Sequence, residues 1–408
     1  RKTLATTLLL CVVALLTACG GAGVDGDGFE NSNDSPAIRA LKISARQGDD
    51  EAQYDLALAY EKGRGVGKNN ARAARWYRKA AEQGQAEAQY KLGGMILSGI
   101  GTPQDSIAAM GWRRQAAEQG HLASQFSLAL MYAQGEGVPR DPEREAHWYR
   151  QAAGQGHLKA QIRLADMYAR GRGVGRDPAE AVVWNRKAAD QGDAGAQFKL
   201  GGAYDEGRGI GRDQSEAARW YRLAADQDQG SAQQNLGHLY MSGEGVGQDY
   251  AQAAHWYQQA ALKGLADAQN GLAALYRNGW GITADLPMAA EWYRKAAEQG
   301  YVDSQFSLGM IYQEGKYITQ DYKKAVEWFS KAAEQGDSSA QFCLGVMFLH
   351  NAELKDHVTS YAWTDIAAAN GYANAKKNKG IIAKEMTPDQ IAKAQELSKE
   401  MVKKNPKL

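Results

Sequence analysis

Cysteine is nearly absent from this chain, whose 408 residues include only three. Cys11 and Cys19 lie near the start of the sequence, and Cys343 stands alone near its other end. With no second cysteine in the body of the chain, a framework of internal disulfides is excluded. Cys343 falls on an apolar helical pattern, so we interpret it as a small core residue rather than a reactive thiol.

Long hydrophobic runs and strongly charged segments are also missing. Beyond the N-terminal segment, no stretch is apolar for the roughly eighteen residues that a membrane-spanning helix needs. The formal net charge is only +1, and the 48 basic and 47 acidic residues are spread along the chain. This balance argues against nucleic acid as a partner and against a polybasic membrane patch.

Catalytic and metal-binding motifs are missing as well. The sequence has no Gly-x-Ser-x-Gly, Ser-x-x-Lys, Walker loop or His-Glu-x-x-His. The histidines are scattered, and we expect those that open helical patterns, His121 and His157, to face solvent rather than a metal. Asp25-Gly-Asp27 is similar to the start of a calcium loop, but Phe29 takes the next ligand position and no closing Glu follows. We therefore expect no enzymatic activity, no cofactor and no metal.

The N-terminal segment has the pattern of an export signal. A basic start precedes a short apolar run over residues 8–16, and small residues follow up to Cys19. A run of this length is typical of a cleaved secretory signal over residues 1–18. Leu16-Thr17-Ala18-Cys19 also resembles the bacterial lipoprotein signal, which implies a lipid anchor on Cys19. An ordinary cleaved signal with a stray cysteine is the alternative.

The residues after Cys19 bear on location and on flexibility. In Gram-negative lipoproteins an Asp after the lipidated cysteine favours the inner membrane, whereas Gly20 stands here. The resemblance thus implies anchoring in the inner leaflet of the outer membrane, with the protein facing the periplasm. Residues 19–35 are rich in Gly and Asp and predict a flexible tether, because they cannot bury enough apolar surface to order themselves.

The strongest positive signal is a tryptophan that recurs at a fixed interval. Eight tryptophans are each 36 residues apart: Trp76, Trp112, Trp148, Trp184, Trp220, Trp256, Trp292 and Trp328. Such a period without insertions predicts a repeat array rather than a globular enzyme with one core. The full repeats run from 49–84 to 301–336, and a ninth begins at Asp337.

Each repeat predicts two helices, which we call helix A and helix B. In the first repeat, apolar positions from Gln53 to Tyr60 recur at i, i+3, i+4 and i+7, and those from Ala73 onward do the same. Gly63 is placed to end helix A in a left-handed conformation. An Asp or Asn opens helix B, and Glu180 and Glu216 are expected to complete capping boxes there. We expect the tryptophan of helix B to fill the space between neighbouring repeats.

The period, the motif Ala-x-Trp-Tyr-x-x-Ala-Ala-x-x-Gly and the Gly-x-Gly-Val loop resemble the Sel1-like repeat family, which is related to tetratricopeptide repeats. The resemblance implies an all-α fold, a right-handed superhelical solenoid of antiparallel helix-turn-helix repeats with a groove lined by helix A. The solenoid would cover 36–371, starting with a half-repeat, and capping helices would follow over 372–408. The glycine loop follows a helix and recurs, so it predicts a turn and not a phosphate site. Arg113 and Asn185 replace the second aromatic of the motif, and Asp228 replaces a glycine.

Positions that vary between repeats are the candidates for recognition. One outward row on helix A has a basic bias, and the sixth and seventh repeats depart most from the common pattern, with polar residues near an extra tryptophan. The candidate partner-binding residues are Lys91, Arg163, Asp166, Lys199, Gln234, Asn235, His238, Asn270, Asn278 and Trp280. A polar cluster with an exposed aromatic fits a protein-contact patch. Drift at solvated positions is the alternative.

The resemblance also bears on function. Exported lipoproteins of this family are similar to immunity proteins that neutralise phospholipase-type effectors of type VI secretion. It therefore implies a non-enzymatic periplasmic lipoprotein that binds another protein, a phospholipase or lipase effector, through its groove. A scaffold or adaptor in envelope assembly or signalling is the alternative. An enzyme or a binder of cell wall or β-lactams is disfavoured, because the Ser-x-x-Lys motif and the cysteines of such relatives are missing.

Overall fold

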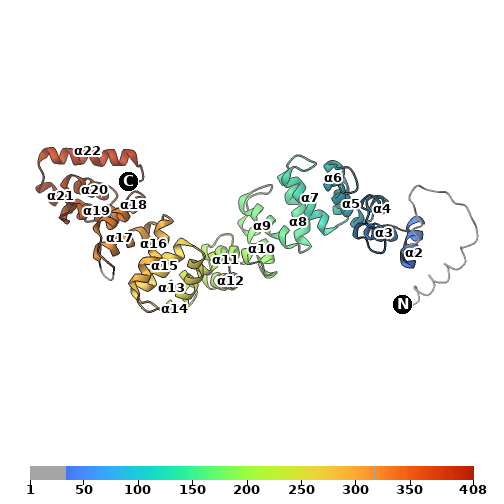
Figure 1. The fold of residues 1–408 in the computed structure, drawn as a ribbon, viewed down its shortest axis with the longest axis horizontal. Helices are drawn as coiled ribbons and strands as arrows, with labels where there is room; N and C mark the ends of the chain where they lie inside the picture. The colour runs from blue at the N-terminus through green and yellow to red at the C-terminus, as the bar shows by residue number, and fades with distance from the viewer. Residues whose placement is uncertain (1–33, 316–317) are drawn as a thin grey trace, which may run out of the picture. The chain divides into compact units, whose positions relative to one another are not determined.

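The computed structural model describes residues 34–315 and 318–408, so Cys19 and the predicted signal over 1–18 lie outside the described residues. The described part contains 21 helices and no strand, which confirms the all-α prediction (Figure 1). The helices are α2 Pro36–Arg46, α3 Asp50–Lys62, α4 Asn70–Glu82, α5 Ala86–Ser98, α6 Ser106–Glu118, α7 Leu122–Gln134, α8 Pro142–Gly154, α9 Leu158–Arg170, α10 Pro178–Asp190, α11 Ala194–Glu206, α12 Gln214–Asp226, α13 Gly230–Ser242, α14 Tyr250–Leu262, α15 Ala266–Asn278, α16 Leu286–Glu298, α17 Val302–Glu314, α18 Tyr322–Ala333, α19 Ser338–His350, α20 His357–Ala369, α21 Ala375–Lys384 and α22 Pro388–Lys404. No helix in this part is long and apolar enough to cross a membrane.

The helices form consecutive hairpins. Each odd-numbered helix from α3 to α19 is the helix A of a repeat, and the next even-numbered helix is its helix B. From α3 to α17, helix A ends at a glycine in the left-handed region, as at Gly63 with φ of 70°, whereas α19 ends at Asn351 in an extended conformation. The second loop glycine lies against the preceding repeat: a Cβ on Gly209 would stand 2.3 Å from the carbonyl oxygen of Pro178. The repeated glycines therefore form a tight turn, as the sequence predicts.

Aspartates begin the B helices by accepting hydrogen bonds from free backbone amides. The Asp177 carboxylate accepts from the amides of Ala179 and Glu180 at 3.0 and 3.1 Å, which satisfies two donors of the first turn. The capping box expected at Glu216 was wrong. Its carboxylate instead accepts a hydrogen bond from the indole Nε1 of Trp220 at 3.1 Å. Arg219 of the same helix also donates to this carboxylate, at 3.2 Å.

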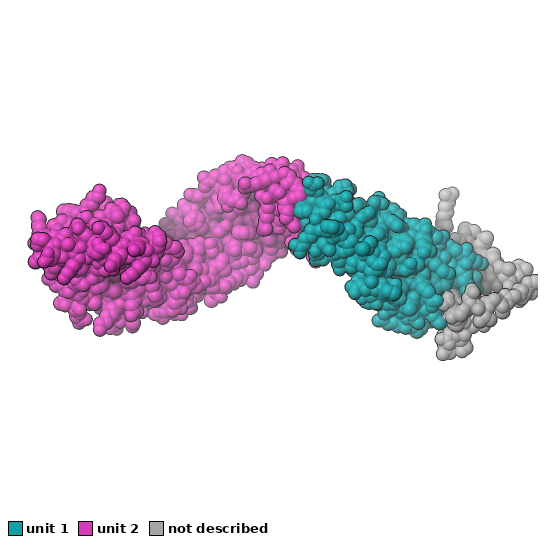
Figure 2. All heavy atoms as spheres, turned by 90° about the horizontal axis from the view of Figure 1, so that it is seen from above, with its two compact units in different colours: residues 1–152 teal, residues 153–408 magenta. Residues whose placement is uncertain are grey.

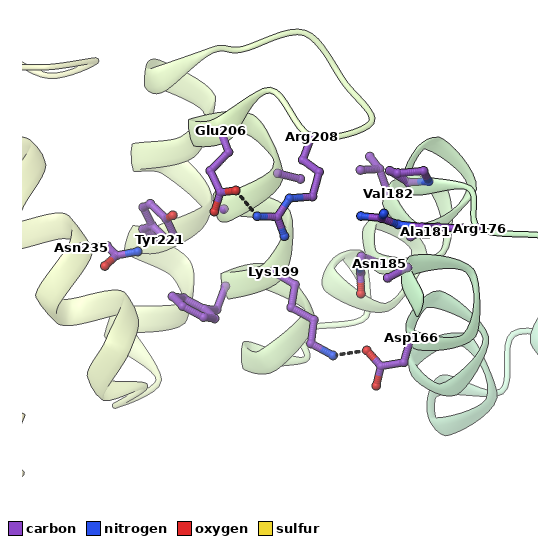
Figure 3. A pocket seen from close by; sticks show the side chains of 15 residues that line it. Asp166, Arg176, Ala181, Val182, Asn185, Lys199, Glu206, Arg208, Tyr221 and Asn235 are labelled. Atoms are coloured by element: carbon purple, nitrogen blue, oxygen red, sulfur yellow. Dashed lines mark hydrogen bonds and ion pairs between the residues drawn. The ribbon is translucent and has the colours of Figure 1, made fainter. Parts of the chain in front are cut away.

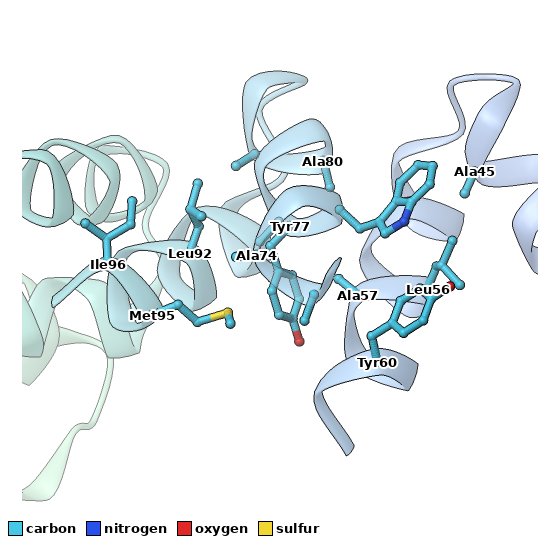
Figure 4. Packing of buried hydrophobic residues seen from close by; sticks show 14 of the residues in the cluster. Ala45, Leu56, Ala57, Tyr60, Ala74, Tyr77, Ala80, Leu92, Met95 and Ile96 are labelled. Carbon is cyan, nitrogen blue, oxygen red and sulfur yellow. The ribbon is translucent and has the colours of Figure 1, made fainter. Parts of the chain in front are cut away.

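The chain forms two compact units, which meet in sequence between residues 152 and 153 (Figure 2). In the first unit, Figure 4 shows Tyr77 of α4 between Ala57 and Leu92, with Ala80 packed nearby. Tyr77 is fully buried and Trp76 is only 6% exposed. Small alanines let neighbouring helices approach closely, and the aromatic rings fill the space that remains.

The second unit repeats this core. The tryptophans Trp184, Trp220, Trp256 and Trp292 are all buried in it, with exposures of 4–8%. Trp328 is half-buried, as are Trp112 and Trp148 in the first unit. At its C-terminal end, α21 and α22 both pack on α20. These two helices cover α20, the second helix of the ninth repeat.

A buried glutamine links each helix A to the helix before it. Nine glutamines at the same repeat position are at most 5% exposed: Gln53, Gln89, Gln125, Gln161, Gln197, Gln233, Gln269, Gln305 and Gln341. The side-chain amide of each donates to a backbone carbonyl eight residues earlier, at 3.0–3.3 Å. Each of these carbonyls also accepts from the backbone amide three residues later, so the glutamine gives it a second hydrogen bond at the end of the preceding helix.

Candidate functional site

The outward faces of the A helices carry polar side chains that contact one another between repeats. Lys199 on α11 forms an ion pair with Asp166 on α9, with 2.7 Å between Nζ and Oδ1. Both side chains remain about one third exposed or more, at 41% and 35%. Two residues of the predicted set are therefore brought together across adjacent repeats.

The sixth to eighth repeats have a similar network. Gln234 on α13 donates to Asp267 on α15 at 2.7 Å, and the hydroxyl of Tyr301 donates to the same carboxylate at 2.7 Å. Asn270 accepts a hydrogen bond from the hydroxyl of Ser304 at 2.8 Å. Gln234 and Asn270 thus hold neighbouring A helices in register as well as lining their surface.

The remaining predicted residues lie in different surroundings. Arg163 on α9 and His238 on α13 are exposed, and Lys91 on α5 is half-buried. The side-chain amide of Asn278 donates to the carbonyl of Ala274 at 2.9 Å, near the end of its own helix. Trp280 is 41% exposed in the loop after α15.

The ring of Trp280 stacks on Tyr250, the first residue of α14, with ring centroids 5.3 Å apart. This contact fixes the indole against the preceding repeat. Asn235 lies elsewhere, half-buried on α13. It borders a pocket that it shares with Asp166 and Lys199.

The pocket lies in the second unit where the second aromatic of the motif is replaced. That aromatic packs on helix A in other repeats: Tyr149 is 5.7 Å from Phe126, and Tyr221 is 5.7 Å from Phe198, between ring centroids. In the fourth repeat the equivalent residue is Asn185. The shorter side chain leaves a pocket of about 340 Å³ (Figure 3).

The pocket combines an apolar wall with a charged rim. Ala181, Val182 and Phe198 supply apolar surface. The rim carries Arg176, the ion pair of Lys199 with Asp166, and a second ion pair between Arg208 and Glu206 (Figure 3). Such a concave surface with a few convergent polar groups is the usual form of a binding site.

Asn185 is the unusual member of this lining. Its side chain is buried, with 8% exposed, and its Oδ1 atom has no hydrogen-bond partner. Buried polar atoms in proteins almost always have a partner, so an orphaned one calls for an explanation. Among the residues that line this pocket, Asn185 alone has such an atom.

Tyr221 borders the same pocket and is held in its neutral form. Burial raises its pKa to about 12, and the nearby Asp205 adds to this, while a hydrogen bond with Asn235 acts in the opposite direction. Its hydroxyl donates to the Asp205 carboxylate at 3.4 Å. The phenol therefore acts as a neutral wall of the pocket at physiological pH and not as a base.

Two histidines differ from the sequence expectation. His121 and His157 are half-buried, and their Nδ1 atoms accept from the amides of Ser124 and Ala160, both at 3.2 Å. His121 also contacts Glu87 through Nε2 at 2.7 Å. They serve as caps for α7 and α9, which the position before a helix start could have indicated. In residues 34–315 and 318–408, no group of three or more metal-ligating side chains is close enough to hold an ion.

Cys343 lies on α19 in an apolar setting. It is partly buried, and burial raises its pKa to about 11. A thiol with such a pKa is protonated at neutral pH and a poor nucleophile. This agrees with its interpretation as a packing residue.

Sequence reasoning identified the departure at Asn185 but did not recognise it as a site. The sequence does indicate it, because a small polar residue stands at a position that an aromatic ring fills in most repeats. The buried glutamines were also missed as hydrogen-bonding residues, although their 36-residue period is as regular as that of the tryptophans.

Comparison with known proteins agrees with this architecture. The model of the Sel1 repeat family matches nine consecutive segments: 50–85, 86–121, 122–157, 158–193, 194–229, 230–265, 266–301, 302–337 and 338–372. No curated protein matches the chain.

Solved structures give the same result. A protective antigen of uropathogenic Escherichia coli with an SLR fold is 36% identical, has a TM-score of 0.70, and the match covers 90% of this chain and 79% of that one. A Sel1 repeat protein from Oxalobacter formigenes is 32% identical with a TM-score of 0.55, covering 82% and 99%. An immunity protein from Pseudomonas aeruginosa is 22% identical with a TM-score of 0.29, covering 52% and 81%, and this likeness is too low to bear on function.

The nine matched segments span most of the chain and coincide with its helical hairpins. The two nearest of these structures share more than 30% of their residues with it over more than four fifths of its length. This chain belongs to the Sel1 repeat family.

Proposed function

We propose that this protein is a non-enzymatic lipoprotein of the periplasm that binds another protein through the outward face of its A helices. The partner we propose is a secreted phospholipase or lipase effector, which the protein would inhibit as an immunity protein does. Anchoring at Cys19 would hold it at the outer membrane, where a membrane-attacking enzyme acts.

One observation carries the binding role: the buried positions repeat, whereas the outward positions of helix A differ from repeat to repeat. Tryptophans, alanines and glutamines recur every 36 residues. By contrast, the outward row reads Lys91, Arg163, Lys199 and Asn235 in four of the repeats. A regular frame with an irregular polar surface can recognise one partner specifically, and an array of repeats offers it over an extended area.

The inhibitory role is supported by the resemblance of the N-terminal segment to a lipoprotein signal together with the family membership. Inhibition by occupying a surface needs no catalytic group in this protein. It needs only that the partner be blocked where it attacks the membrane.

The test is purification of the full-length protein with its partners from envelope extracts. We expect a lipase or phospholipase to co-purify and to lose hydrolytic activity when the purified protein is added in equimolar amounts. Recovery of only assembly or signalling proteins would replace the inhibitor with the scaffold alternative. A recovered lipase that stays fully active in the complex would also contradict inhibition.

The location is tested separately with Cys19→Ala. Metabolic labelling with palmitate should mark the unaltered protein in the outer-membrane fraction, and the variant should lose the label and become soluble in the periplasm. Cys343→Ala is the matched control and should keep both label and membrane association. An unlabelled protein found free in the periplasm would rule out the anchor while leaving protein binding intact.

A further inference from the structure

The fourth repeat lacks a ring that its neighbours have. In the third and fifth repeats, Tyr149 and Tyr221 each pack against a phenylalanine of helix A, with 5.7 Å between ring centroids. The equivalent positions of the fourth repeat hold Ile162 and Asn185. The pocket of about 340 Å³ beside Asn185 is lined by Val182 and Phe198, so it has apolar surface where a ring can pack.

The pocket also presents an unmet hydrogen bond. Asn185 is more than nine-tenths buried and its Oδ1 has no partner. The Oδ1 atom of a carboxamide only accepts, so the group that completes it must donate a hydrogen bond. A hydroxyl does so and carries no charge.

The rim favours an aromatic ring over a charged side chain. Guanidinium groups of this chain lie over tyrosine rings elsewhere: Arg186 is 5.5 Å from the ring centroid of Tyr204, and Arg222 is 5.5 Å from that of Tyr240. Arg176 and Arg208 border the pocket in exposed positions. They can stack on an incoming ring by the same cation–π interaction.

Other side chains match this lining less well. A carboxylate only accepts hydrogen bonds, so it would leave the Asn185 oxygen without a partner. A lysine would meet the three cations of the rim. A phenylalanine would fill the space but leave the Asn185 amide without a partner.

We propose that this pocket binds a tyrosine side chain of the partner protein, with its hydroxyl bonded to Asn185 and its ring against Val182 and Phe198. The proposal rests on the protein-binding function proposed above and names one contact of it. The partner's tyrosine would take the place that the chain's own tyrosine takes in the neighbouring repeats. Buried tyrosines are among the residues that dominate the energy of protein interfaces.

The direct test uses N-acetyl-L-tyrosinamide as the probe, titrated into the full-length protein and followed by NMR. For a ligand of this size we expect a dissociation constant of about a millimolar or below. Ring-current shifts should affect the methyl groups of Val182 and Ala181. N-acetyl-L-phenylalaninamide should bind at least threefold more weakly, and N-acetyl-L-aspartamide should not bind. Stronger binding of the aspartate probe, or no binding of the tyrosine probe, would overturn the proposal.

Two variants and one control assign the probe to the pocket. Asn185→Tyr restores the chain's own ring and should weaken probe binding at least tenfold. Asn185→Leu keeps the space but removes the amide, so the tyrosine and phenylalanine probes should then bind equally. Arg113→Tyr makes the same restoration in the second repeat and should leave binding unchanged. If Asn185→Tyr binds the probe as well as the unaltered protein does, the pocket is not the site.

The same variants separate this proposal from the function on which it rests. Once a partner is purified, Asn185→Tyr should lower its affinity at least tenfold, whereas Arg113→Tyr should not change it. A partner that binds both variants equally would leave the protein-binding function in place and remove the tyrosine pocket. Failure to find any partner would count against the function, while the probe titration would still decide the pocket.

Discussion

The second and fourth repeats lose the same aromatic residue, with opposite results. In the second repeat the replacement is Arg113, whose long stem fills the space: a Cβ on Gly93 would lie only 2.9 Å from the Cγ of Arg113. In the fourth repeat Asn185 is too short to do so, and a pocket remains. Both replacement residues are polar, so the length of the side chain decides whether a pocket forms at the position of the missing ring.

Both replacement residues, Arg113 and Asn185, have a buried polar atom that is unfavourable for stability. The Nε of Arg113 and the Oδ1 of Asn185 are buried without a hydrogen-bond partner. Burial lowers the pKa of Arg113, although the nearby Tyr90 acts against this, and its guanidinium lies 5.8 Å from the centre of the Tyr90 ring. The Arg113 side chain itself fills the position of the missing ring, whereas Asn185 leaves a pocket beside it that another group can enter.

Removing a ring that is present should have the largest effect. Tyr221→Asn copies the fourth repeat into the fifth, where the ring is 2% exposed. We expect a loss of about 3 kcal/mol in the local free energy of unfolding, because a cavity replaces a buried ring. Hydrogen exchange of amides in α11 and α12 measures this locally, which suits a repeat array that need not unfold in one step. A loss below about 1 kcal/mol would show that these slots tolerate polar residues without cost.

Removing a buried glutamine hydrogen bond should lower the free energy of unfolding by somewhat less than the loss of a ring. The loss should be equal for the glutamines that follow the second and the fourth repeats. Gln125 and Gln197 donate to Ala117 and Ala189, each at 3.2 Å, at the ends of the second and fourth B helices. Replacement of either by Leu removes one buried hydrogen bond, while the carbonyl keeps its bond from the amide of Gly120 or Gly192, and should cost about 1 kcal/mol. Hydrogen exchange on either side of each bond provides the measurement. A markedly smaller loss for the Gln197 replacement would mean that the pocket already weakens the packing between α10 and α11.

These two sets of residues show what the sequence could and could not predict. Periodicity is a property of the chain, so the helices, their glycine ends and the buried Trp76 and Tyr77 followed from spacing alone. The pocket beside Asn185 depends on the volumes of side chains from five helices, and the spacing of residues in a sequence does not measure volume. The capping by His121 depended on a local geometry in which its ring nitrogen, and not solvent, receives the amide of Ser124.

Restoring the missing rings should stabilise the protein modestly in both repeats. Asn185→Tyr and Arg113→Tyr should each raise the local free energy of unfolding by about 1 kcal/mol, since each removes an unpaired buried polar atom and the first fills a cavity. Thermal denaturation and hydrogen exchange of the two B helices, α10 and α6, provide the comparison. Destabilisation by Asn185→Tyr alone would show that its pocket cannot hold a ring, and this would also weigh against the proposed tyrosine contact.

The smallest effect concerns pH. The pKa of Tyr221 is raised to about 12, so its neutral form is favoured in the folded protein relative to the unfolded chain. Its contribution to stability is fully present below the unfolded value of about 10 and is lost as the pH rises toward 12. Denaturation between pH 9 and 12 should show a decline that is shallower in Tyr221→Phe. Identical pH profiles for the two proteins would contradict the buried position of this hydroxyl.

The buried glutamines impose a rule on how this protein can change in length. Each one bonds to the end of the helix just before it and, in most repeats, to a side chain at the end of the helix just after it. Excising one whole period therefore brings together two ends that already match. A deletion inside the segment between a glutamine and the carbonyl eight residues before it would instead rotate that glutamine by about 100° per residue around its helix, away from the carbonyl it needs. Such a chain can therefore grow or shrink by complete hairpins, and the span of surface it offers changes in equal steps.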